Sequence, residues 1–321
     1  MKWTFYDPAG FIAEQGVLDF EKSKNLDLKS DKKLLVEENK DAYLIHQGLI
    51  TYTISKINGL ISSVKKNGET ILENGPEFTI VPMNKEDGGK NDIAGETYQR
   101  NIQPLQNFPW YAKYAKNFDI VKESDSLFVS TDIIFKEGKG KVTYVFYSDG
   151  RFETRYKISD ISQTLTPYQY GLRIVLPKSF DQLTWKREGD FSLYPDDHIG
   201  RNEGKAVMNA TQTTGVVPWR KKPEHSWKDD ANELGSNDFR STKRNIIKAS
   251  LSKDSQTKVS VMSNTKQASR SWLQEEFTHW LIADYTNNGS EPFYGTPHSS
   301  GRIKLDNESV LEGVLTLIIQ Q

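Results

Sequence analysis

Five histidines, 43 acidic residues and no cysteine limit the chemistry open to this chain. The histidines form no H-x-H or H-E-x-x-H pair, so a zinc site would have to be assembled from distant loops. The nearest approach to a polar cluster is Tyr194-Pro195-Asp196-Asp197-His198, which could bind a cation through two carboxylates and an imidazole. Because neighbouring strand residues point to opposite faces, the competing interpretation is an ordered turn whose aspartates accept backbone amides. We expect the turn, with no metal and no cofactor.

Covalent and acid–base catalysis find no clear support among the residues. The chain has no G-x-S-x-G elbow and no cysteine nucleophile, which leaves acyl transfer unsupported. Glycoside hydrolysis needs two carboxylates held about 5 to 10 Å apart. Nothing in the spacing of the acidic residues singles out such a pair, so the sequence assigns no catalytic residue.

Several large aromatic rings stand beside proline or polar residues in expected loops, as in Phe108-Pro109-Trp110-Tyr111 and Val217-Pro218-Trp219. Such rings can stack on the apolar face of a sugar while polar neighbours bind its hydroxyls. The alternative is that they fill the ends of a hydrophobic core. The candidate carbohydrate-binding residues are Trp110, Tyr111, Tyr194, Trp219, Arg240, Trp272 and Trp280.

Strands must position these residues, because apolar and polar residues alternate in nearly every segment whose pattern is clear. Lys141 to Tyr147 and Arg151 to Ile158 flank an Asp-Gly step, which is a strong hairpin signal. Two short segments, Tyr111 to Asn117 and Lys266 to Glu276, could be helical. Many strands with tight turns and no α–β alternation predict an all-β, antiparallel sandwich or barrel. Further strands are expected at 42–55, 127–135, 173–176, 246–251, 259–262, 279–284 and 309–319.

The N-terminus differs from the rest of the chain. Two short strand-like runs surround Asp7-Pro8-Ala9-Gly10. The charged stretch from Asp19 to Lys33 has no regular spacing of apolar residues and is typical of a linker. A lone hairpin cannot bury a core by itself. We therefore expect residues 1–33 to be a remnant of a preceding domain plus a linker, and residues 34–321 to form one β-domain.

Charge and hydropathy disfavour two classes of partner. The 42 basic residues nearly cancel the 43 acidic ones, so no concentrated basic face is available for nucleic acid. No stretch approaches the ~20 apolar residues of a membrane helix.

The first 20 residues lack the pattern of a signal peptide. The compartment stays open, because the absence of cysteine suits both the cytosol and a periplasmic or secreted parent whose signal lies outside this chain.

A long block of the sequence is similar to a known domain. Tyr170 to Asp181 (YGLRIVLPKSFD), followed by Trp185 and Tyr194-Pro195-Asp196, resembles the C-terminal small-chain β-sandwich of family 2 glycoside hydrolases, the β-galactosidase type. The segment Tyr6 to Gln15 is similar to the final strands of the immunoglobulin-like domain that precedes it. Further stretches agree in order: Thr53 to Ile61, Asn74-Gly75-Pro76, Val217-Pro218-Trp219 and Asn237 to Lys243.

This resemblance implies a galactose-mutarotase-like supersandwich of two large antiparallel sheets. It also implies that the catalytic glutamates lie in an upstream TIM barrel, for which this chain has neither the length nor the β–α alternation. The family's late Gly-Asp-Asp-Ser-Trp segment is not found, so no galactose-contacting tryptophan is implied. The expected function is a non-catalytic domain that supports the barrel and contacts carbohydrate, with the barrel and the immunoglobulin-like domain as partners.

Two other functions stay open. A free-standing mutarotase-like epimerase would need a histidine acid and a glutamate base in the concave sheet. Mutarotases carry a His-Pro-x-x-Asn-like stretch, whereas here His298 follows Pro297 in the reverse order. An independent carbohydrate-binding module would differ from the first function if the isolated domain bound sugar unaided.

Overall fold

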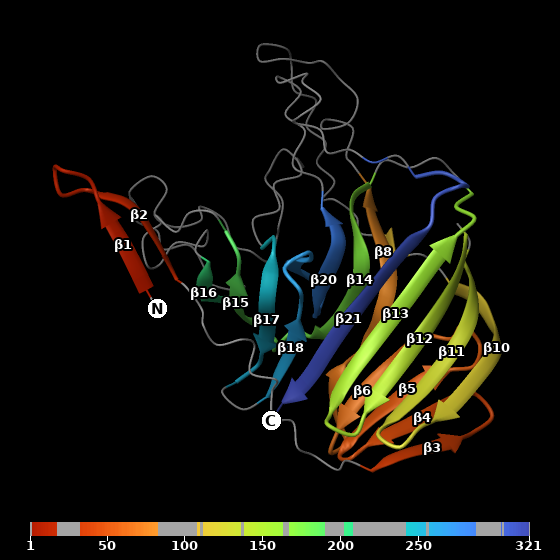
Figure 1. Ribbon diagram of the computed structural model, residues 1–321. Coiled ribbons are helices and arrows are strands. Elements are labelled where there is room, and N and C mark those ends of the chain that lie inside the picture. The colour runs from red at the N-terminus through yellow and green to blue at the C-terminus, as the bar shows by residue number, and fades with distance from the viewer. Residues whose placement is uncertain are drawn as a thin grey trace.

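The computed structural model contains β-strands and no helix within the residues that it describes (Figure 1). Every strand pairing among these residues is antiparallel, which confirms the all-β fold class. In the described part of the chain, no helix is long and apolar enough to cross a membrane. The structure describes residues 2–17, 33–82, 108–109, 112–135, 138–162, 167–189, 202–207, 242–254, 257–286, 303 and 305–320.

The largest sheet has nine strands, and the C-terminal strand lies in its middle, between β13 and β18. Its expected hairpin is confirmed, because β12 and β13 pair around Gly150, whose φ of 94° suits glycine. In sheet order the strands are β10 (Ala112–Lys122), β11 (Ser126–Phe135), β12 (Lys139–Tyr147), β13 (Arg151–Ser159), β21 (Leu311–Gln320), β18 (Lys258–Met262), β17 (Ile246–Ser252), β15 (Gln182–Arg187) and β16 (Glu203–Val207).

Among the described residues, two five-stranded sheets accompany the largest one. The first is a meander in which each strand pairs with the next: β3 (Leu34–Glu38), β4 (Ala42–Gln47), β5 (Ile50–Ser55), β6 (Ile61–Lys66) and β7 (Glu69–Leu72). The second joins segments that are far apart in the sequence, in the order β19 (Ala268–Gln274), β20 (Phe277–Thr286), β14 (Pro167–Pro177), β8 (Asn74–Pro82) and β9 (Phe108–Pro109).

All three large sheets contribute to one main core. Figure 1 shows β10 to β13 of the largest sheet lying over β3 to β6 of the meander. Between them, Tyr52 lies 4.8 Å from Phe146 and 4.9 Å from Phe152, measured between ring centroids. The other five-stranded sheet buries Phe78, Ile174 and further apolar residues in the same core. The alternation of buried and outward residues that predicted the strands is therefore what forms this core.

The N-terminal hairpin consists of β1 (Lys2–Tyr6) and β2 (Ile12–Val17), which form a two-stranded sheet of their own. The two expected runs around Asp7 are thus confirmed as strands, and Asp7 Oδ1 accepts hydrogen bonds from the backbone amides of Ala9 and Phe11. Residues 18–32 lie outside the described residues. The division at residue 33 stays a prediction.

The two segments that the sequence left open to a helix form strands in the structure. Ala112 to Asn117 belongs to β10, which pairs with β11, and residues 268 to 274 form β19. In β19, Ser269 and Ser271 face the main-core side, whereas Arg270 and Trp272 face the other side. This period of two fits a strand paired with β20 rather than a helix.

Candidate functional site

The face of the β19–β20–β14–β8 sheet that points away from the main core carries an unusual set of polar side chains. On β14, Leu172, Ile174 and Leu176 belong to the main core. Successive strand residues point to opposite faces, so Arg173 and Val175 belong to the other face. Arg173 is only 8% exposed there, although nothing in the apolar run around it offers a counter-charge.

Strand register brings the partners of Arg173 to this face. Arg173 lies directly opposite Glu77 of β8, and Val175 lies opposite His279 of β20. His279 in turn lies opposite Trp272 of β19. Figure 1 shows β8, β14 and β20 side by side. We name the resulting group the Arg173 cluster, which consists of Glu77, Gln169, Arg173, Arg270, Trp272 and His279.

A buried ion pair is the centre of the Arg173 cluster. Arg173 Nη2 donates to Glu77 Oε1, and their side chains are 10% and 7% exposed. Arg173 Nη1 lies 3.2 Å from Nδ1 of His279. Burial, and then the positive charge of Arg173, lower the pKa of His279 to about 3. At neutral pH the imidazole is therefore uncharged, and Arg173 donates hydrogen bonds to two different strands.

Aromatic and apolar groups frame these polar contacts. The Trp272 ring stacks on the His279 ring, with 5.3 Å between centroids and 17° between planes. The Arg270 guanidinium lies 4.8 Å from the Trp272 ring centroid, and its Nη1 donates to Gln169 Oε1 at 3.3 Å. The apolar residues buried on this face form a second small cluster, which consists of Val81, Ala268, Trp272, Leu281 and Ala283.

The chemistry that this arrangement supports is recognition rather than proton transfer. A glutamate and a histidine do share one sheet face, as an epimerase would require. However, the Glu77 carboxylate and the His279 Nδ1 are both engaged by Arg173. A histidine with a pKa of about 3 is almost never in the imidazolium form at pH 7, so it is a poor general acid, although its neutral ring still carries one N–H. Guanidinium, carboxylate and imidazole groups beside an aromatic ring are instead the types of group that fix a polar ligand in a mostly apolar site.

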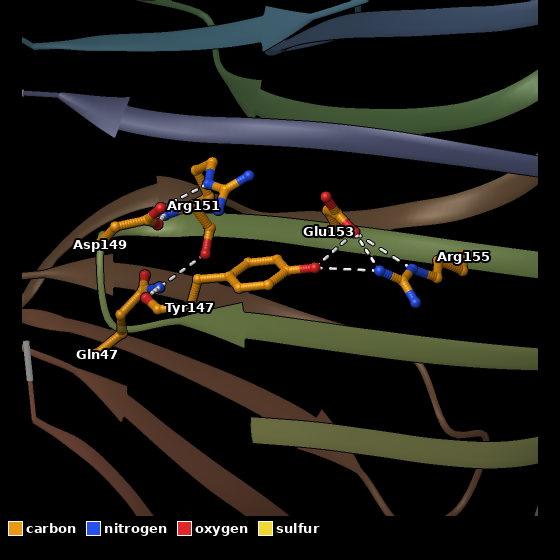
Figure 2. Close-up of polar contacts among 6 residues, drawn as sticks. All are labelled: Gln47, Tyr147, Asp149, Arg151, Glu153 and Arg155. Atoms are coloured by element: carbon orange, nitrogen blue, oxygen red, sulfur yellow. Dashed lines mark hydrogen bonds and ion pairs between the residues drawn. The ribbon is translucent and has the colours of Figure 1, made fainter. Parts of the chain in front are cut away.

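A second polar network lies where the β12–β13 hairpin meets the meander sheet (Figure 2). Gln47 of β4 is fully buried, and its Nε2 donates to the backbone oxygens of Tyr147 and Arg151 at 2.8 and 2.9 Å. The Tyr52 hydroxyl donates to Gln47 Oε1 at 2.9 Å. One glutamine thus ties the end of the hairpin to the facing sheet.

The charged part of this network lies on the outer side of the hairpin. Arg151 Nε donates to Asp149 Oδ2 at 2.7 Å, and its guanidinium lies 4.5 Å from the ring centroid of Tyr147. Glu153 accepts from the Tyr147 hydroxyl at 3.0 Å and from Arg155 at 2.7 Å (Figure 2). Burial and the neighbouring carboxylate raise the pKa of Tyr147. Because each charge already has an opposite partner, we interpret this network as structural.

The structure places two of the sequence-predicted site residues. Trp272 belongs to the Arg173 cluster. Trp280 is fully buried in the main core, where its Nε1 donates to Ser269 Oγ at 2.8 Å, so its ring has no exposed face for a sugar. The other candidates, Trp110, Tyr111, Tyr194, Trp219 and Arg240, lie outside the described residues.

The expected turn at Asp196-Asp197-His198 also lies outside the described residues. Within the residues that the structure describes, no group of three or more histidine and acidic side chains could hold a metal ion. Sequence reasoning missed Glu77, Arg173 and His279. The available signal was Arg173 itself, a single charge inside an apolar strand, because a buried charge requires a partner.

Known proteins resemble this chain in sequence and in fold. Over 271 residues it is 21% identical to a β-galactosidase from Staphylococcus xylosus, a match that covers 81% of this chain and 26% of that protein. Among solved structures, a galactose mutarotase-like protein from Lactobacillus casei is 11% identical, with a TM-score of 0.41 and coverage of 90% of this chain and 99% of that chain. Galactose 1-epimerase from Lactobacillus acidophilus is 11% identical, with a TM-score of 0.42 and coverage of 91% and 99%.

The family comparison covers the part of the chain that holds most of the sandwich strands. Residues 46–206 match the family described as β-galactosidase small chain. This segment includes β8 and β14, and thus Glu77 and Arg173 of the Arg173 cluster. The match extends over half of the sequence and agrees with the residues that first suggested the resemblance. The chain belongs to the β-galactosidase small-chain family.

Proposed function

We propose that this chain is a non-catalytic domain of a β-galactosidase-like glycoside hydrolase of family 2. In this role it packs against a catalytic barrel and an immunoglobulin-like domain of the same parent protein, and it contacts carbohydrate through the Arg173 cluster. The observation that carries the proposal is the family match at residues 46–206 in a chain that spans 26% of the curated β-galactosidase it matches.

The geometry of the Arg173 cluster supports a binding role. Its polar groups lie on one sheet face with apolar neighbours, and strand register holds them in fixed positions. Preorganised polar groups of this kind bind a ligand with little loss of side-chain entropy. Sugar oxygens accept hydrogen bonds, so they suit a site that offers guanidinium and imidazole donors beside an aromatic ring.

Two measurements on the isolated chain test this proposal. Calorimetric titration with lactose and with methyl β-D-galactoside should detect binding that Arg270→Met weakens, because the substitution removes the buried guanidinium beside Trp272. The absence of binding to a broad glycan array would refute the carbohydrate contact.

The second measurement is hydrolysis of an aryl β-galactoside by the purified chain. We expect no turnover, since the catalytic glutamates of the resembled family belong to the barrel. Turnover that survives purification and disappears when one glutamate of this chain is replaced would refute the non-catalytic role. Polarimetry of freshly dissolved α-D-galactose tests the epimerase alternative in the same way, and we expect no acceleration of mutarotation.

A further inference from the structure

The contact between Arg173 and His279 fixes which imidazole nitrogen carries the proton. A guanidinium can only donate hydrogen bonds, so His279 Nδ1 must accept at the 3.2 Å contact with Arg173 Nη1. A neutral imidazole that accepts at Nδ1 carries its proton on Nε2. His279 is therefore the Nε2–H tautomer, and this nitrogen is a donor.

Two further contacts hold the donor in place. The ion pair with Glu77 fixes the other arm of the Arg173 guanidinium, and the Trp272 ring covers one flat face of the imidazole. Among the described residues, none accepts a hydrogen bond from Nε2. His279 as a whole is 8% exposed.

We propose that Glu77 and Arg173 are positioning residues that hold His279 as a fixed hydrogen-bond donor to an oxygen atom of the bound sugar. The inference rests on the proposed carbohydrate contact and names the group that makes it. The ligand atom is an acceptor, such as a hydroxyl or ring oxygen. Glu77 does not touch the sugar and acts through Arg173.

This arrangement makes the donor independent of pH in the ordinary range. The charged groups that face His279 from the described strands are Arg173 on β14, Glu77 on β8 and Arg270 on β19. Burial and Arg173 together place the pKa of His279 at about 3. Sugar affinity should therefore stay constant between about pH 5 and 8, where an ordinary histidine with a pKa of about 6.5 would change charge.

The first experiment measures the tautomer without any sugar. Long-range ¹H–¹⁵N correlation spectra of the histidine-labelled chain should show His279 protonated on Nε2 from pH 5 to 8, with its signals assigned by comparison with the His279→Gln variant. The double variant Glu77→Gln/Arg173→Met removes both charges of the ion pair and the donor to His279 Nδ1, so both tautomers of His279 should appear. A proton on Nδ1 in the wild-type chain, or titration above pH 5, would overturn the inference.

The second experiment measures sugar affinity by calorimetry with lactose. His279→Phe keeps a flat ring against Trp272 and removes the donor, so we expect at least a tenfold loss of affinity. His279→Gln restores an N–H donor and should recover most of that loss. The matched control is His46→Phe on the meander sheet, where Nδ1 contacts Thr51 Oγ1 at 3.0 Å, and it should leave the affinity unchanged.

The outcomes separate this inference from the proposed function. If the wild-type chain binds lactose and His279→Phe binds equally well, the carbohydrate contact stands and the role of His279 is refuted. If the wild-type chain binds no sugar, both the contact and the donor role fail, whatever the tautomer. A tenfold loss in the phenylalanine variant together with the Nε2–H tautomer supports both.

Discussion

Removal of Arg173 should be among the most damaging single substitutions in the chain. Arg173→Met replaces the guanidinium with an apolar side chain of similar length, and it leaves the Glu77 carboxylate buried with a side-chain exposure of 7%. Breaking a buried ion pair from one side costs about 3 to 5 kcal/mol, because the remaining charge is no longer compensated. Glu77→Gln keeps an acceptor for Arg173 and should cost less, about 2 kcal/mol.

The double variant separates pairing from packing. With both charges removed, no uncompensated charge remains in the site, and such a replacement often costs little. We expect Glu77→Gln/Arg173→Met to be about as stable as Arg173→Met alone or more stable, which corresponds to a coupling energy of at least about 2 kcal/mol. Urea unfolding at pH 7, followed by tryptophan fluorescence, measures the four free energies of unfolding.

A matched surface pair provides the control. Lys157 Nζ lies 2.5 Å from Glu312 Oε1, but these side chains are 62% and 60% exposed. Exposed pairs of this kind couple by less than about 1 kcal/mol. If the Glu77–Arg173 cycle gives an equally small coupling, the pair is not desolvated and the account of the Arg173 cluster is refuted.

Three further substitutions have clear expected outcomes. Gln47→Leu leaves two backbone carbonyls of the hairpin and the buried Tyr52 hydroxyl without their hydrogen-bond partner, so urea unfolding should show a loss of about 2 to 4 kcal/mol. Tyr147→Phe removes one partly exposed hydroxyl and should cost less than about 1 kcal/mol. Equal losses in the two variants would contradict the role of Gln47 in joining the hairpin to the meander sheet. Asp284 of β20 accepts hydrogen bonds from the Tyr156 hydroxyl at 2.6 Å and from Gln267 Nε2 at 2.8 Å, and burial raises its pKa above the usual 3.8. Its contribution to stability is therefore present below pH 3.8 and is lost as pH rises through the folded-state pKa. Asp284→Asn should therefore gain stability relative to wild type as pH rises above about 4, and a difference that does not change with pH would refute this. In Gly171→Ala the new methyl carbon would lie 2.1 Å from the Ile282 backbone oxygen, so thermal unfolding should show a loss of about 2 kcal/mol or more, and unchanged stability would contradict the close approach of β14 and β20.

The strands were predictable because their signals are local. Alternation over Lys141 to Tyr147 and the Asp149-Gly150 turn specify β12 and β13 without information from elsewhere in the chain. Local signals did not predict the strand within Lys266 to Glu276, because the pairing of β19 with β20 decides its conformation. Short segments of mixed polarity are where tertiary contacts override local preference.

The candidate site was far less predictable, and the reason is sequence separation. Arg173 lies 96 residues from Glu77 and 106 from His279, so the cluster exists only once the register of four strands, β8, β14, β19 and β20, is set. The sequence pointed instead to aromatic rings beside proline or polar residues, and of the two such candidates that the structure describes, Trp272 lies in the cluster and Trp280 lies in the main core. Register across distant strands cannot be read from the composition of any one of them.

The central claim is that carbohydrate binds on the Arg173 face of this small-chain domain. Its most direct test is an NMR titration of the isotopically labelled chain with lactose, in which backbone amide shifts report where the ligand lies. The account predicts that the shifts concentrate on β8, β14, β19 and β20 around Arg173 and His279. Shifts confined to the β12–β13 hairpin, or none at high lactose concentration, would contradict it.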